Sequence, residues 1–203
     1  MGEITAILPQ KKDKKRCSIY VDGQFCCGLN LETAVKNRLK AGMTIDAAEL
    51  EKLQFESEKT TAFDRALTHL SASMKSEKEM SDYLKKKGYL PAVIDYVLEK
   101  LRDYSFVDDE EYARQYVKSA SKNKGRRLIG LELQRKGVSE ETAQTAVDEI
   151  PDEDAAARRV LQKYMRSRTA DKETLYKAFR YLLSKGFEYE TARSALTAYG
   201  ETE

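Results

Sequence analysis

The side chains of this chain that are best suited to chemistry are its Lys and Arg residues, which gather in clusters between acidic stretches. One cluster lies in the middle of the chain and comprises Lys118, Lys122, Lys124, Arg126, Arg127, Arg135 and Lys136. A second comprises Arg158, Arg159, Lys163, Arg166 and Arg168. No acidic residue occurs between positions 118 and 131. Cations segregated in this way are suited to bind phosphate groups or acidic protein surfaces. We therefore predict that eight of them belong to a nucleic-acid or acidic-groove interface: Lys118, Lys122, Lys124, Arg126, Arg127, Arg135, Arg158 and Arg159.

Smaller basic clusters lie elsewhere in the chain. They are Lys85–Lys87 and Lys11–Arg16. The formal net charge of +2 neither requires nor excludes a nucleic-acid partner, since the distribution of charge matters more than its sum. Solvated helix faces are the alternative interpretation of the same clusters.

No combination of residues indicates catalysis. The chain has 1 His, so no dyad of histidines can form, and it lacks a Gly-x-Ser-x-Gly motif and a glycine-rich phosphate loop. Its carboxylates occur in runs, Asp108–Glu111 and Asp148–Asp154. Such runs suit helix starts and linkers better than acid–base chemistry. We expect a protein that is not an enzyme and that uses no cofactor.

The cysteines and the apolar runs indicate in which cellular compartment the protein is expected. There are 3 cysteines, Cys17, Cys26 and Cys27, and this odd, clustered set is not a disulfide framework. His69 is distant in sequence, so we expect three buried thiols and no metal site. No apolar run approaches the ~20 residues that a membrane span needs. The N-terminal apolar run 4–8 is too short for a signal peptide. A cytoplasmic protein is therefore expected.

A repeat organises most of the chain. Gly88, Gly137 and Gly186 follow one another at intervals of 49 residues, and each is preceded by Lys. Leu84, Leu133 and Leu182 share that spacing, as do apolar residues on either side. A fixed period of this size is typical of a helical array. Most of these matched residues serve packing, because three helices of ~10 residues bury little surface alone.

Each repeat reads as three short helices. In the middle repeat Asp108 is placed to cap the first helix, with Glu111 at its third position. The second helix is expected over residues 126–136, ended by Gly137 in a left-handed conformation. Ser139 caps the third helix, which ends before Pro151. Pro91 falls in the first turn of the corresponding helix of the first repeat.

The first sixty residues differ from the repeats. Residues 16–21 and 24–29 are β-prone and are separated by Asp22-Gly23, which predicts a hairpin. In a two-residue loop Val21 faces Gln24 and Ile19 faces Cys26, so that Cys26 and Cys27 point to opposite faces. A short helix over residues 31–39, ended by Ala41-Gly42, is expected next. Asp46 then caps a helix that runs on toward the first repeat.

These elements predict a mainly α fold of three tandem three-helix, helix-turn-helix-like repeats, elongated, with a small N-terminal β-hairpin extension. The expected domains are residues 1–60 for the extension, then 61–107, 108–152 and 153–203 for the three repeats.

The middle repeat resembles the RecX family of recombinase regulators. The resemblance rests on Tyr104–Asp109, on Tyr112 to Arg114, and on Tyr116-Val117. It continues through Lys124–Arg127 and Arg135–Val138, and extends over about residues 60–200. The resemblance implies a non-enzymatic modulator that binds the RecA filament on single-stranded DNA and inhibits its activities, in the regulation of DNA repair, recombination and the SOS response. The basic surface of the family maps onto Lys124, Arg126 and Arg127.

The implied partners are the RecA filament and DNA, single-stranded or also double-stranded, and a monomer is expected. Two alternatives from other classes stay open. One is a helix-turn-helix transcription factor, which needs a helix with exposed base-reading side chains. The other is a helical-repeat protein-interaction scaffold without nucleic acid. Salt-dependent DNA binding distinguishes the scaffold from both DNA-binding hypotheses.

Overall fold

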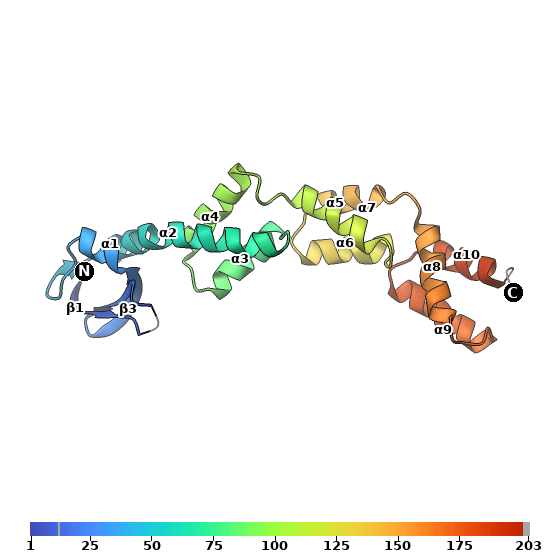
Figure 1. The fold of residues 1–203 in the computed structure, drawn as a ribbon, viewed down its shortest axis with the longest axis horizontal. Coiled ribbons are helices and arrows are strands. Elements are labelled where there is room, and N and C mark those ends of the chain that lie inside the picture. Colours follow the sequence, from blue (N-terminus) through green and yellow to red (C-terminus); the bar gives the residue numbers. More distant parts are fainter. Residues whose placement is uncertain (12, 201–203) are drawn as a thin grey trace. The chain divides into compact units, whose positions relative to one another are not determined.

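The computed structural model describes residues 1–11 and 13–200. Lys12 of the N-terminal basic cluster and residues 201–203 of the expected last repeat lie outside the described residues. The described residues form four strands and ten helices (Figure 1). They divide into two compact units: residues 1–73 with 80–106, and residues 74–79 with 107–203. No helix among the described residues is long and apolar enough to cross a membrane.

The first unit begins with an antiparallel sheet of order β3-β2-β1-β4. The predicted hairpin is present as β2, Arg16–Val21, and β3, Gln24–Asn30. Its turn residues Asp22 and Gly23 have φ values of 49° and 79°, as a two-residue turn with two left-handed positions requires. Two further strands, β1 (Gly2–Pro9) and β4 (Thr44–Ile45), extend the expected hairpin. A short apolar run such as 4–8 does not by itself reveal a strand.

The expected register of the hairpin is wrong beyond the turn. Val21 pairs with Gln24, but Ile19 pairs with Cys27 rather than with Cys26. A bulge between Ile19 and Tyr20 leaves Cys26 without a partner residue, and a bulge shifts every later side chain by one position. Cys26 is consequently exposed, whereas Cys17 and Cys27 are buried. The expectation of three buried thiols is therefore wrong at Cys26.

Helices α1 and α2 contribute to the core of the sheet. Ala34 of α1 (Leu31–Lys36) and Leu50 of α2 (Ala47–Ala72) pack with Ile4, Ile19 and Leu29. Helix α1 ends before the predicted residue 39. Arg38 takes a left-handed φ of 52°, and Leu39 N–H then donates back to the Ala34 carbonyl over 2.9 Å. This backbone reversal ends the helix before Gly42 is reached.

Helix α2 begins where the sequence predicts. The Asp46 side chain accepts a hydrogen bond from Glu49 N–H over 2.7 Å, and the helix continues without a break through residue 72. It packs against α4, Pro91–Asp103, with Pro91 in the first turn as expected. Between them in sequence lies α3, Glu77–Lys86. Gly88 follows α3 with a φ of 84°.

The second unit contains two three-helix groups, each with its own core. The first comprises α5 (Asp109–Ala120), α6 (Arg126–Arg135) and α7 (Glu140–Asp148). The second comprises α8 (Glu153–Met165), α9 (Lys172–Ser184) and α10 (Tyr189–Gly200). The predicted caps are confirmed: Asp108 accepts from Glu110 and Glu111 N–H, and Ser139 accepts from Thr142 N–H.

Helix α6 ends as its sequence predicts. Gly137 has a φ of 93°. Its N–H donates to Gln134, and Val138 N–H donates to Leu133, over 2.9 and 3.1 Å respectively. These two bonds are the signature of a Schellman helix end.

Candidate nucleic-acid interface

All eight predicted contact residues belong to the second unit. Lys118 lies in the last turn of α5, and Lys122 and Lys124 lie in the segment that follows it. Arg126, Arg127 and Arg135 belong to α6, and Arg158 and Arg159 to α8. The structure separates them into two classes, according to whether the side chain is already hydrogen-bonded within the protein.

Lys124 is engaged within its own three-helix group. Its Nζ lies 2.7 Å from both carboxylate oxygens of Glu132, and the Tyr116 hydroxyl donates to Oε2 of Glu132 over 2.6 Å. The hydrogen bond with Glu132 raises the pKa of Lys124. Burial alone would raise the pKa of Glu132, but its bonds with Lys124 and Tyr116 outweigh burial and lower it. The lysine is therefore part of a charge-assisted triad that joins α5 to α6.

Arg126 joins α6 to the start of α8. Its backbone N–H donates to Oε1 of Glu153 over 2.8 Å, and its Nη2 donates to the Ile150 carbonyl over 2.5 Å. Its Nε is buried without a hydrogen-bond partner. Burial raises the pKa of Glu153, although the bond from the Arg126 N–H works in the opposite direction. The guanidinium thus holds the connection between the two groups of this unit.

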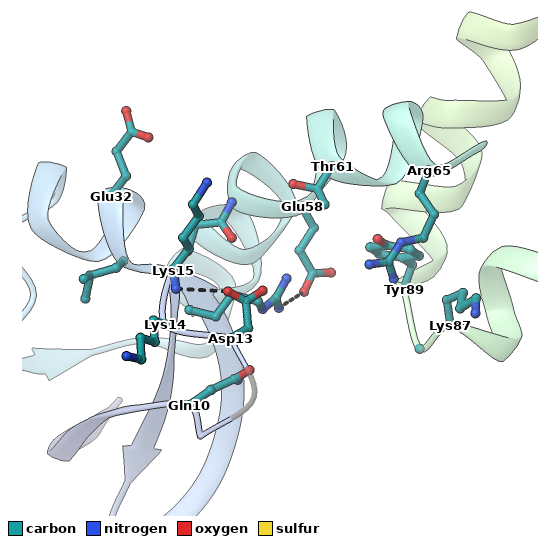
Figure 2. Close-up of a pocket in the computed structure, with 14 residues that line it drawn as sticks. Gln10, Asp13, Lys14, Lys15, Glu32, Glu58, Thr61, Arg65, Lys87 and Tyr89 are labelled. Carbon is teal, nitrogen blue, oxygen red and sulfur yellow. Dashed lines mark hydrogen bonds and ion pairs between the residues drawn. The ribbon is translucent and has the colours of Figure 1, made fainter. Parts of the chain in front are cut away.

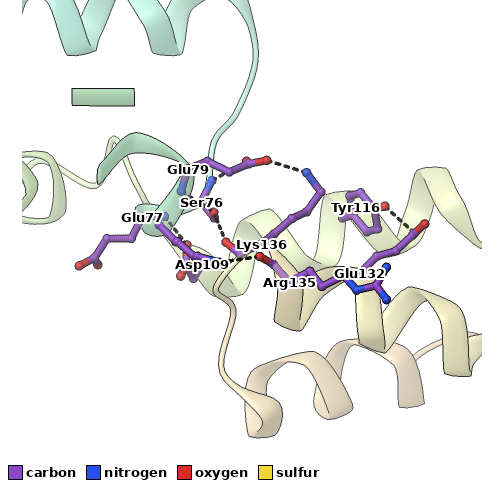
Figure 3. A network of polar contacts seen from close by, with 9 residues as sticks. Ser76, Glu77, Glu79, Asp109, Tyr116, Glu132, Arg135 and Lys136 are labelled. Carbon is purple, nitrogen blue, oxygen red and sulfur yellow. Dashed lines mark hydrogen bonds and ion pairs between the residues drawn. The ribbon is translucent and has the colours of Figure 1, made fainter. Parts of the chain in front are cut away.

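A polar network surrounds the C-terminal end of α6 (Figure 3). The Ser76 hydroxyl donates to the Lys136 carbonyl over 2.5 Å, and Lys78 Nζ donates to the Arg135 carbonyl over 2.9 Å. Lys136 Nζ in turn lies 2.6 Å from Oε1 of Glu79. The first turn of α3 therefore supplies donors to the carbonyls that a helix end leaves unpaired. We call this arrangement, Ser76–Glu79 on Arg135–Gly137, the first clasp.

A second clasp repeats the first further along the chain. Gly125 N–H donates to the Lys185 carbonyl over 2.9 Å, and Arg127 Nη2 donates to the Leu183 carbonyl over 2.9 Å. Gly125 follows Ser76, Arg127 follows Lys78 and Lys185 follows Lys136 by the same interval as the repeat glycines. The start of one repeat's second helix thus grips the Lys-Gly end of the next repeat's second helix.

Close approach accompanies both clasps. A Cβ on Gly137 would lie 2.3 Å from Cβ of Lys78, and a Cβ on Gly186 would lie 2.3 Å from Cβ of Leu128. These two glycines therefore meet two requirements, a left-handed backbone and room for the neighbouring helix.

Five of the eight predicted residues have no such engagement. The side chains of Lys118, Lys122, Arg135, Arg158 and Arg159 are exposed, and none of them hydrogen-bonds or pairs with a carboxylate among the residues that the structure describes. Three other exposed cations of this unit are paired: Arg114 with Glu111 over 3.0 Å, Lys177 with Glu173 over 2.5 Å and Arg193 with Glu190 over 2.9 Å. We call these five residues the free cation set.

Sequence reasoning did not predict Ser76, Lys78 and Glu79 as a contact surface. The signal was nevertheless present, because the interval that relates the glycines also relates Ser76 to Gly125 and Lys78 to Arg127. Because these polar residues repeat at the same interval as the apolar ones, the sequence contains the information that the same contact forms in two places.

Four family models match this chain. The model for the regulatory protein RecX N-terminal domain matches residues 2–46. Those for the first, second and third three-helix domains of RecX match residues 62–101, 108–147 and 152–196.

Whole proteins and solved structures agree with these models. A regulatory protein RecX of Clostridium perfringens (strain SM101 / Type A) is 34% identical over 200 residues, which cover 96% of this chain and 94% of the relative. That of Bacillus subtilis (strain 168) is 33% identical, covering 97% and 76%. A crystal structure of regulatory protein RecX superposes with a TM-score of 0.63 at 25% identity, covering 95% of this chain and 98% of that one. The structure of RecX from Lactobacillus salivarius, at 24% identity and a TM-score of 0.61, covers 70% and 96% and supports the fold alone.

Proposed function

Because the chain belongs to the RecX family of regulatory proteins, we propose that it inhibits the RecA recombinase by binding the RecA filament on single-stranded DNA. Such a protein acts without chemistry of its own, by occupying a surface that the filament needs for ATP hydrolysis and strand exchange. Its place is the regulation of DNA repair and recombination in the cytoplasm.

The observation that carries the proposal is the free cation set. An exposed cation without a carboxylate gains little for folding, since even exposed ion pairs contribute only about 0–1 kcal/mol. Five such residues in one unit supply contacts to phosphates, each of which releases a counterion when it forms. The exposed sides of α5, α6 and α8 are therefore the proposed contact surface.

The three remaining predicted residues take a different part in the proposal. Lys124 and Arg126 hold α5, α6 and α8 in place, and Arg127 belongs to the second clasp. They position the surface from which the free cations project. Replacing all three would disturb folding as well as binding, so that triple variant cannot test contact with the filament alone.

Co-sedimentation with RecA filaments assembled on a homopolymeric single strand tests the proposal. The test variant replaces the free cation set with Ala. The control replaces five exposed lysines of the first unit with Ala, namely Lys36, Lys40, Lys52, Lys85 and Lys86. Both variants lose the same charge, so a difference between them reports the position of the charge rather than its amount.

The expected result is weakened binding by the test variant and near-parental binding by the control. For the isolated protein on single-stranded DNA, the dependence of log affinity on log salt should become shallower by up to about 3.5, since each lost phosphate contact removes about 0.7. Equal binding by the two variants across a salt series would refute the proposed surface.

A further inference from the structure

The Lys-Gly helix end occurs three times in this chain and is gripped only twice among the described residues. The third copy, Lys87-Gly88 after α3, has the same left-handed glycine, with a φ of 84°. A Cβ on Gly88 would meet nothing within 4 Å, unlike one on Gly137 or Gly186. Within the described residues no donor reaches the carbonyl of Lys87, although the equivalent carbonyls of Lys136 and Lys185 each accept a hydrogen bond.

The uncovered end opens onto a basic cavity of about 750 Å³ within the first unit (Figure 2). Lys87, Gly88 and Tyr89 line it together with Lys14, Lys15 and Arg65. Arg16 and Glu58 also face it, but they neutralise each other in an ion pair of 2.9 Å. Only Asp13 and Glu32 oppose the four remaining cations of the lining. The cavity therefore combines an excess of positive charge with an unpaired helix-end carbonyl.

The first clasp shows what kind of group can pair with both a lysine ammonium and an unpaired helix-end carbonyl. There the first turn of α3 brings a hydroxyl donor from Ser76 to the Lys136 carbonyl, and the carboxylate of Glu79 to the Lys136 ammonium. A helix start with acidic residues offers unpaired N–H groups, a capping hydroxyl and carboxylates within one turn. The ammonium of Lys87 is exposed, and the contact that the structure gives it is with the Tyr83 ring, 5.3 Å from the centroid.

We propose that the Lys87-Gly88 end and its basic cavity are a docking site for the acidic first turn of a helix in a partner protein. The docked turn would donate to the Lys87 carbonyl, place a carboxylate against the Lys87 ammonium, and lie over Gly88, where the absence of a side chain leaves room. Lys14, Lys15 and Arg65 would attract further carboxylates of the same turn.

The chain's own spare helix start does not fit this site. In the last repeat the residue equivalent to Gly125 is Thr174, but α9 already begins at Lys172. The Asp171 side chain accepts from Thr174 N–H over 2.8 Å, so the donor that a third clasp would use is occupied. The start of α9, whether of this chain or of a second copy, is therefore not the occupant.

Nucleic acid fits the site less well than a helix start. Phosphates offer only acceptors, and the carbonyl end of a helix carries partial negative charge that opposes them. The identity of the partner as a subunit of the recombinase filament rests on the proposed function. The proposal that this site binds an acidic helix start does not depend on the proposed function.

A peptide probe tests the docking chemistry by itself. The probe is a fluorescent, side-chain-stapled helix with the sequence of residues 73–86, whose first turn forms the first clasp within the intact chain. We expect fluorescence anisotropy to show binding to the full-length protein. Lys87→Glu should weaken it about tenfold, whereas Lys85→Glu, an equal charge change outside the cavity, should change it less than twofold. A probe carrying Glu79→Lys should fail to bind.

Two results would refute the docking site. Absence of probe binding up to millimolar concentration refutes it, as does equal binding by the Lys87→Glu and Lys85→Glu proteins. Loss of oligonucleotide binding, rather than of probe binding, in Lys87→Glu would identify a nucleic-acid site instead. The unchanged circular dichroism spectrum expected of both exposed substitutions confirms that the fold is intact.

Titration of the same two variants into the recombinase ATPase assay tests the choice of partner. Weaker inhibition by Lys87→Glu than by Lys85→Glu supports a filament subunit as the occupant. Equal inhibition by both, with probe binding lost in Lys87→Glu, overturns that choice of partner and leaves the docking site established. Failure of the parent protein to inhibit would refute the proposed function, while the probe experiment would still decide the site.

Discussion

At the scale of single residues, identical side-chain types perform different work in the second unit. Lys124 and Lys136 each meet a carboxylate at about 2.6–2.7 Å, whereas Lys118 and Lys122 are exposed without one. A sequence places all four in basic clusters but does not reveal which carboxylate will fold against them. Glu132 lies close to Lys124 in sequence, yet Glu79 lies far from Lys136. Only the folded structure separates the free cation set from the cations that are hydrogen-bonded within the protein.

The repeat glycines allow a matched pair of substitutions. Gly137→Ala and Gly88→Ala introduce the same left-handed penalty of about 1 kcal/mol. Only at Gly137 does the new methyl group fall 2.3 Å from Lys78 Cβ. We expect Gly137→Ala to lower the free energy of unfolding by at least about 1 kcal/mol more than Gly88→Ala, because overpacking adds to backbone strain. Urea denaturation measures both. Equal losses would mean that the first clasp is not tightly packed in solution.

The lowered pKa of Glu79 predicts that the stability of the protein depends on pH. Burial raises its pKa, but the hydrogen bonds from Lys136 and Ser76 N–H prevail and hold the pKa below its ordinary value of 4.5. A carboxyl with a depressed folded-state pKa stabilises the protein above the unfolded pKa, and this stabilisation disappears as pH falls through the folded pKa. Glu79→Gln keeps an acceptor for the Ser76 N–H but removes the charge.

The expected cost of Glu79→Gln at pH 7 is about 1 kcal/mol, since the paired side chains are 30% exposed each. The difference in free energy of unfolding between the variant and the parent protein should shrink once the pH drops below about 4. Chemical denaturation at a series of pH values measures it. A difference that stays constant down to the acid limit would show that the ion pair contributes nothing to folding.

At the scale of elements, residues at helix ends make several of the contacts between helices of the second unit. Ser76 and Glu79 form a reciprocal capping box at the start of α3, with both hydrogen bonds at 3.2 Å. The same hydroxyl that accepts from Glu79 N–H donates to the Lys136 carbonyl. One residue therefore begins one helix and covers the end of another.

Ser76→Ala and Ser139→Ala separate these two roles. Both remove a helix-capping oxygen, which costs about 1 kcal/mol. Ser76 is fully buried and also serves Lys136, whereas Ser139 is exposed and caps α7. We expect Ser76→Ala to be the more destabilising by about 1 kcal/mol, because it also removes the donor to the partly buried Lys136 carbonyl. Similar effects of the two substitutions, measured by thermal or urea unfolding, would contradict a structural role for the clasp.

Local chemistry made most of the elements predictable. Asp46, Asp108, Ser139 and Gly137 are capping residues whose effect reaches only a few positions along the chain, and all four act as their sequence predicts. The bulge beside Cys26 and the early end of α1 at Arg38 were not predictable in this way. The end of α1 depends on a left-handed backbone at a non-glycine residue, Arg38, and the bulge depends on how β2 and β3 pair. The surrounding fold imposes both. Strands β1 and β4 likewise depend on partners distant in sequence.

The site was less predictable than the fold for the same reason. The sequence identified the second unit as basic and free of acidic residues near Lys118–Leu131. It did not show that Arg126 reaches Ile150 or that Arg127 reaches Leu183. The eight residues stay a prediction as a contact surface; five of them are free cations, and three are hydrogen-bonded within the protein.

At the scale of the whole molecule, two compact units offer two different kinds of surface. The second unit carries the free cation set, which suits phosphates. The first unit carries the Lys87-Gly88 cavity, which suits an acidic helix start. The transcription-factor and scaffold alternatives differ from the proposed function in what these surfaces bind. Sequence-specific footprinting would favour the former, and salt-independent association without DNA binding would favour the latter.

The recombinase ATPase on single-stranded DNA, measured while this protein is titrated in, tests the central proposal most directly. We predict that the parent protein and the first-unit charge control suppress ATP hydrolysis in a saturable manner. The variant without the free cation set should need severalfold more protein, and the gap should narrow as salt screens the contacts. ATP hydrolysis that stays at its starting rate at every concentration of the parent protein would contradict the account.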